Sequence, residues 1–184
     1  MKLSLLSILL GVGMSVPQVY ALTKPAQFTA AARKLPRNLN VGIALMLLST
    51  AWFLWIVNQE PIADFSSFKP FMMVGFAAVG VLTCFFVQDF LGARGLAVAL
   101  MLLGKLMVDT GRPHLGQSSF VLVIQTWAYV LIVAGMWFTI TPWKLRDFIE
   151  FNTATDKRIR IGSAVRLAFA LFIVALGLTV FRQM

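Results

Sequence analysis

The chain has 184 residues, of which 59% are hydrophobic and 12% charged, and its mean hydropathy is +0.85. This composition excludes an ordinary soluble domain, because such a domain needs a polar shell around its core. The net charge of +9 would suit nucleic acid, but the basic residues form clusters between apolar stretches instead of one solvated face. We therefore expect an all-α integral membrane protein whose anionic partners are membrane lipids and not nucleic acid.

Six apolar stretches each approach the roughly 20 residues that a membrane-spanning helix needs. They predict a single transmembrane domain over residues 1–184, built as a polytopic helical bundle. The expected spans are 3–22, 40–57, 70–88, 92–109, 119–140 and 162–181. The third and fourth spans form one run that is too long for a single helix, so its polar interruption predicts a tight turn near 89–94.

The first segment also fits a cleavable secretory signal, because Lys2 precedes the apolar run and Val19-Tyr20-Ala21 offers a cleavage site. Cleavage would leave five spans and would place 22–39 outside. That segment has no acidic residue and carries four basic ones: Lys24, Arg33, Lys34 and Arg37. Because positively charged loops stay in the cytoplasm, we expect the first helix to be retained.

A cytoplasmic loop at 23–39 implies that the loops at 89–94 and 141–161 are cytoplasmic too. The cytoplasmic side then holds ten basic residues: Lys24, Arg33, Lys34, Arg37, Arg94, Lys144, Arg146, Lys157, Arg158 and Arg160. The outer side holds four: Lys2, Lys69, Arg112 and Arg182. This bias predicts that both termini lie on the outer side, and the expected location is a bacterial inner membrane.

Each of the two long loops contains a short amphipathic segment. In the second loop, Thr141 suits a helix N-cap and Pro142 the first helical position. The apolar residues that follow share one helical face: Leu145, Phe148 and Ile149. The first loop repeats this spacing with Phe28, Ala31, Ala32 and Leu35. We expect two interfacial helices, which are either an internal repeat or a chance convergence of two hairpins.

Basic residues on and beside these segments are the expected contacts to anionic lipid. They are Arg33, Lys34, Arg37, Lys144, Arg146, Arg158, Arg160 and Arg166. Arg166 differs from the others because it lies within the last span, where an ionisable residue is costly. Its long side chain can reach back to the lipid phosphates at the cytoplasmic interface.

The hairpin formed by the fifth and sixth expected spans is similar to a small family of two-helix bacterial inner-membrane proteins of uncharacterised function. The similarity covers about 127–180 and consists of a span, a basic amphipathic helix and a second span that bears a glycine. It rests on Pro142, Trp143, Lys144, Arg160 and Gly162.

A polar cluster is expected near the outer end of the fourth span. Lys105 and Asp109 are four residues apart, so they share one helix face and can pair. The stretch from Lys105 to Arg112-Pro113 resembles the first signature of the type 2 phosphatidic acid phosphatases, in which both basic residues would bind phosphate. That chemistry also needs two histidines, and His114 is the only one in the chain. The candidate cluster of Lys105, Asp109, Arg112 and His114 is therefore not predicted to be catalytic.

The sequence indicates no metal site and no cofactor. It has no paired Cys, His or carboxylate ligands at metal-binding spacing and no glycine-rich phosphate loop. Gln125 is expected to hydrogen-bond across helices. The small-residue pairs Gly95 with Ala99 and Ala164 with Ala168 are expected to allow close helix packing.

Three functions fit these features. The first is a non-enzymatic accessory or scaffold subunit of a membrane complex, associated with other membrane subunits or with further copies of itself. The second is a small transporter or channel that uses Lys105 and Asp109. The third is a protein that binds lipid phosphates or head groups at the outer face.

Overall fold

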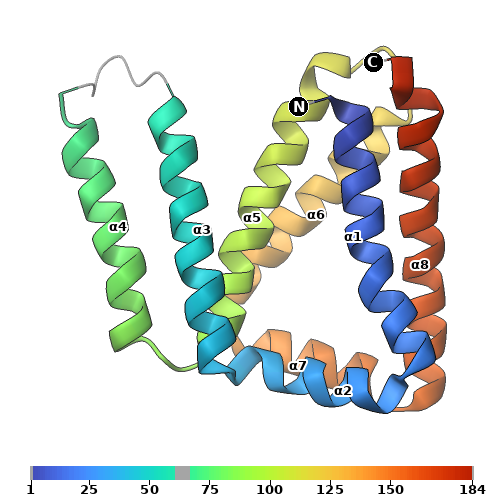
Figure 1. Ribbon diagram of the computed structural model, residues 1–184, viewed down its shortest axis with the longest axis horizontal. Coiled ribbons are helices and arrows are strands. Elements are labelled where there is room, and N and C mark those ends of the chain that lie inside the picture. The colour runs from blue at the N-terminus through green and yellow to red at the C-terminus, as the bar shows by residue number, and fades with distance from the viewer. Residues whose placement is uncertain (1, 61–66, 184) are drawn as a thin grey trace. The chain divides into compact units, whose positions relative to one another are not determined.

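The computed structural model describes residues 2–60 and 67–183, and these residues form helices and no β-strand. Six described helices are long and apolar enough to cross a membrane (Figure 1). They are α1 (Leu3–Thr23), α3 (Leu39–Gln59), α4 (Lys69–Phe86), α5 (Leu91–Gly111), α6 (Val121–Ile140) and α8 (Asp156–Leu178). The expected all-α multi-pass membrane protein is confirmed.

Short helices occupy the two predicted amphipathic segments. They are α2 (Pro25–Lys34) and α7 (Trp143–Asn152). Short 3₁₀ turns follow α2, α5 and α8: η1 (Leu35–Arg37), η3 (Arg112–His114) and η4 (Val180–Gln183). Thr141 does not cap α7 as expected, because its hydroxyl donates to the Trp137 carbonyl of α6 (2.9 Å) and the helix begins at Trp143.

All spans except α8 begin within two residues of the expected positions. α8 starts at Asp156, well before residue 162, because the Thr155 side chain accepts a hydrogen bond from the Arg158 amide and caps the helix. α5 starts at Leu91, after a turn in which Phe90 has a φ of 53°. Arg94, expected in the turn, therefore lies in the first turn of α5 and bonds through its amide to the Phe90 carbonyl (3.1 Å).

The helices group into two compact units. Unit 1 consists of Met1–Arg33, Leu103–Leu131 and Arg146–Met184, and unit 2 consists of Lys34–Leu102 and Ile132–Leu145. α5 and α6 are each divided, with one part of the helix in unit 1 and the other in unit 2. The single transmembrane domain expected over 1–184 stays a prediction.

In unit 1, α1 and α8 run side by side in opposite directions (Figure 1). Two glycines allow this close approach. A Cβ on Gly11 would lie 2.7 Å from the Ala170 carbonyl oxygen, and one on Gly177 would lie 3.0 Å from that of Ser4. The expected pair Ala164 and Ala168 is exposed, so the prediction for that pair was wrong and α8 packs through another face.

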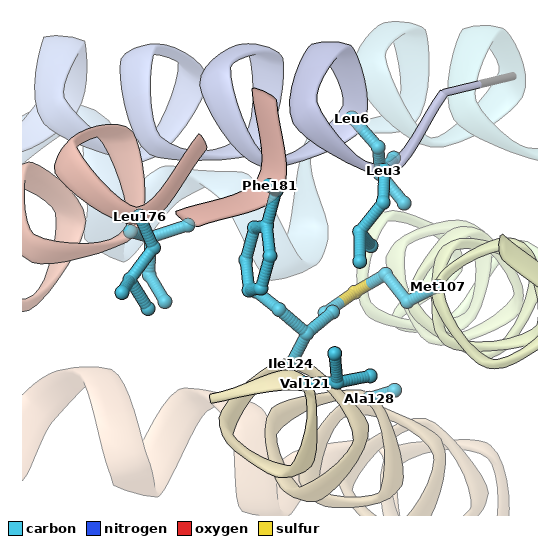
Figure 2. Close-up of a cluster of buried hydrophobic side chains, with 9 residues drawn as sticks. Leu3, Leu6, Met107, Val121, Ile124, Ala128, Leu176 and Phe181 are labelled. Carbon is cyan, nitrogen blue, oxygen red and sulfur yellow. The ribbon is translucent and has the colours of Figure 1, made fainter. Parts of the chain in front are cut away.

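A buried cluster joins the ends of these two helices to α5 and α6 (Figure 2). Its members are Leu3, Leu6, Met107, Val121, Ile124, Ala128, Ile173, Leu176 and Phe181. Figure 2 shows the Phe181 ring reaching from η4 into the middle of these side chains. The start of α1 and the end of α8 therefore lie at the same end of unit 1.

In unit 2, α3 packs against α4 and against the first part of α5. A Cβ on Gly42 would lie 2.7 Å from the Gly92 amide nitrogen, and one on Gly95 would lie 2.8 Å from Leu45 Cβ. The expected close contact at Gly95 is thus confirmed. The buried Ser49 hydroxyl donates to the Gly95 carbonyl (3.3 Å), which adds a polar link between the two helices.

We predict that Gly11→Leu lowers the melting temperature of the detergent-solubilised protein by roughly 2–10 °C, because the added side chain overpacks the α1–α8 contact. Gly13→Leu is the matched control, since nothing lies within 4 Å of a Cβ at Gly13. Thermal unfolding followed by circular dichroism measures both. Equal melting temperatures for the two variants would contradict this packing.

Candidate functional site

Lys105 and Asp109 form the expected pair on α5. Lys105 Nζ lies 2.6 Å from Asp109 Oδ2, and the side chains are 41% and 51% exposed. An exposed pair at this helical spacing contributes only about 0.3–0.5 kcal/mol in water. The two residues satisfy each other on the surface of unit 1, where they line none of the described cavities.

The other two members of the expected outer cluster follow in η3. Arg112 is exposed, and His114 Nδ1 lies 3.0 Å from Gln117 Oε1. Gln125 lies buried beside this end of α5 and donates to the Val108 carbonyl (3.2 Å), which confirms its expected bond across helices. This bond packs α5 against α6 and supplies no reactive group.

Arg33 joins the two amphipathic helices of unit 1. Its Nε donates to the Thr153 hydroxyl (3.0 Å) and its Nη2 donates to the Thr153 carbonyl (2.8 Å). Thr153 directly follows α7, so this fork connects the end of α2 to the end of α7. Arg33, expected as a lipid contact, therefore also serves as a structural link.

Arg146 of α7 is surrounded by carboxylates. Its Nη2 lies 2.8 Å from Asp147 Oδ1, and its Nε lies 3.8 Å from Glu150 Oε1. The hydrogen bond to Asp147, together with the charges of both acids, raises the pKa of the Arg146 guanidinium above its ordinary value. These acids compete with a lipid phosphate for the same donors.

The remaining expected lipid contacts lie near the surface. Arg37 stacks on the Phe90 ring and Arg158 on the Phe151 ring, each with its guanidinium carbon 4.8 Å from the ring centre. The side chains of the other three are exposed: Lys34, Lys144 and Arg160. Their positions leave these cations accessible to head groups.

Arg166 is placed differently from all of these residues, because it lines a cavity of about 70 Å³ in unit 1. The guanidinium folds back along α8, so that its Nη2 lies 3.1 Å from the position a Cβ would take on Gly162. The absence of a side chain at Gly162 therefore leaves room for it. The cavity is walled by α2, α7 and α8, through Phe28, Ala32, Phe148, Ile149, Asn152, Thr153 and Ile159.

The Arg166 charge is poorly compensated. Its Nε is buried and has no hydrogen-bond partner in the described part of the chain. Asn152 donates its amide to the Phe148 carbonyl (2.8 Å), so its Oδ1 remains available as an acceptor near Gly162. A buried guanidinium donor without an acceptor costs on the order of 1–3 kcal/mol or more.

Two further buried polar atoms of unit 1 lack partners among the described residues: Gln18 Oε1 and Ser163 Oγ. The antiparallel register fixed at Gly11 and Gly177 places Gln18 of α1 alongside the turn of α8 that holds Ser163 and Arg166. Hydrocarbon offers no hydrogen bonds, so three such atoms in one region create a demand for a polar ligand or water. Arg166 Nε and the Ser163 hydroxyl can donate to an anion, whereas Gln18 Oε1 accepts and needs a donor such as water.

Sequence reasoning identified Arg166 and missed Gln18, Ser163 and Asn152. Hydropathy does not indicate which face of a span is buried, so it cannot distinguish a buried Gln or Ser in an apolar run from an exposed one. No group of three or more His, Cys, Asp or Glu side chains that could hold a metal ion occurs within 2–60 and 67–183.

No family model, curated protein or solved structure matches this chain. The similarities to two-helix inner-membrane proteins and to the phosphatase signature stay resemblances of a few residues.

Proposed function

We propose that this chain is a non-enzymatic membrane protein that holds an anionic lipid head group between α2, α7 and α8 of unit 1. The observation that carries the proposal is the Arg166 guanidinium, which lines a small cavity and has a buried Nε without an acceptor. A phosphate oxygen would supply that acceptor and neutralise the charge. This location replaces the outer-face cluster as the head-group site, because Lys105 and Asp109 there are already paired.

The surroundings of the cavity support the same ligand. α2 and α7 bring further cations to this end of unit 1, and Arg158 and Arg160 open α8 beside them. Each basic residue near an anionic membrane surface adds about 1 kcal/mol of attraction. The aromatic rings of Phe28 and Phe148 line the cavity and suit the boundary between head groups and acyl chains.

The orientation that we propose puts α2 and α7 at the cytoplasmic face of a bacterial inner membrane and both termini outside. The excess of Lys and Arg in the loops that hold these helices supports it. The packing of α1 along α8 supports a retained first helix, because Leu3 and Leu6 belong to the buried cluster of unit 1.

An accessory or scaffold subunit is the second candidate. The exposure of α4 favours this role, because only 11% of its most apolar stretch of 18 residues is buried. Large side chains such as Phe71, Phe85 and Phe86 are 75%, 69% and 80% exposed. Another membrane subunit or a second copy of the chain would cover this face by helix packing. Transport through Lys105 and Asp109 has less support, because their mutual pair is exposed.

We predict that the protein extracted in mild detergent retains phosphatidylglycerol and that Arg166→Gln lowers this retention about tenfold or more. The expected size follows from the loss of a charge-assisted hydrogen bond worth about 1.5–3 kcal/mol. Native mass spectrometry measures the bound lipid and also detects any protein subunit that stays attached.

Arg182→Gln is the matched control, because it removes the same charge beyond the other end of α8, where Arg182 is exposed. Equal lipid retention by both variants and the wild type would overturn the head-group site. A bound partner subunit on a chain without lipid would favour the accessory role instead.

Reporter fusions test the orientation. Alkaline phosphatase is active only outside the cytoplasm, so we predict an active fusion after Met184 and an inactive one after Thr153. Immunoblots normalise the activities to the amount of each fusion. Activity of the Thr153 fusion without activity of the Met184 fusion would reverse the proposed topology.

A further inference from the structure

Unit 2 contains a larger cavity of about 370 Å³, within the range of small-molecule sites. Its walls come from α3, α4, α5 and α6. The lining residues are Met46, Thr50, Phe53, Phe76, Val79, Gly80, Thr83, Arg94, Val98 and Thr139. The described lining is thus mainly apolar and aromatic, with three threonines and one charged residue.

Arg94 supplies that charge, and its donors are incompletely used. Nη1 donates to the Thr139 carbonyl at a long 3.4 Å, while Nε is buried without a partner in the described part of the chain. The turn at Phe90 fixes the residue, because the Arg94 amide bonds to the Phe90 carbonyl. The backbone that starts α5 thus fixes the Cα of Arg94, and the bond to the Thr139 carbonyl holds its guanidinium at the cavity.

The hydroxyl groups of the three lining threonines already donate hydrogen bonds within the protein, so they are not free to donate to a bound anion. Their hydroxyls bond to the carbonyls of their own helices: Thr50 to Met46 (2.8 Å), Thr83 to Val79 (2.7 Å) and Thr139 to Gly135 (2.9 Å). No acidic residue is among the described side chains that line the cavity. Arg94 thus selects against cations and favours one negatively charged group.

We propose that this cavity binds a single-chain anionic amphiphile, namely a fatty acid, with its carboxylate on Arg94 and its chain among the apolar side chains. A guanidinium can donate two parallel hydrogen bonds to the two oxygens of one carboxylate. The wall of α4 from Phe76 to Thr83 extends about 10 Å at 1.5 Å per residue, which suits an acyl chain. A volume of 370 Å³ near the lower end of the small-molecule range accommodates one chain and not the two chains of a phospholipid.

A photoactivatable fatty acid tests this site in the full chain, reconstituted in nanodiscs of phosphatidylcholine. We expect saturable labelling of the cavity residues on α4 and α5, located by mass spectrometry of the peptides. Oleate should compete, whereas oleylamine, which carries the same chain and the opposite charge, should not. Arg94→Gln should lower labelling about tenfold or more, and Arg94→Lys should retain most of it.

Arg37→Gln is the charge-matched control in the same unit, because Arg37 stacks on Phe90 and does not line the cavity. Val98→Trp fills the cavity and should abolish labelling, with the melting temperature showing that each variant is folded. Undiminished labelling of Arg94→Gln would overturn the proposal. Labelling that does not saturate and is distributed over the exposed faces of α3 and α4 would overturn it too. Stronger competition by phosphatidylglycerol than by oleate would overturn the single-chain ligand.

Discussion

The contact between α1 and α8 determines how unit 1 is built. Gly11 and Gly177 bring two helix backbones close together, although these helices lie at opposite ends of the sequence. Without a hydrophobic driving force inside a membrane, such close packing is a main source of helix association. It also sets where the adjoining segments lie, so α2, which follows α1, meets α7, which precedes α8, and Arg33 binds Thr153.

The same contact also buries polar side chains of unit 1 that lack hydrogen-bond partners among the described residues. Gln18 and Ser163 become buried because α1 and α8 pack along their length, while half-buried Arg166 lines the cavity between α2, α7 and α8. Each of the three retains an atom without a partner among the described residues. Unit 2 repeats this combination of a cavity and an unsatisfied arginine at Arg94. In both places an arginine has a buried Nε without a hydrogen-bond partner among the described residues, next to apolar walls, and an anionic lipid would supply an acceptor together with matching hydrocarbon.

Hydropathy and length were enough to predict the helical class, the spans and the two amphipathic helices, because each depends on the local composition of the chain. The start of α8 could have been predicted as well, since Thr155 is a residue type favoured at N-caps. The faces through which the helices pack could not be predicted in this way. Small residues mark both the contact at Gly95 and the exposed pair Ala164 and Ala168, and only long-range packing distinguishes them.

The register between α1 and α8 is the central claim, and paired cysteines test it most directly. In a Cys84→Ala background, Gln18→Cys with Ser163→Cys should react with a short bifunctional thiol reagent to give a cross-linked product. Gln18→Cys with Val174→Cys should not, because Val174 lies about 16 Å further along α8 at 1.5 Å per residue. Cross-linking of the second pair and not of the first would contradict the register and the buried polar cluster derived from it.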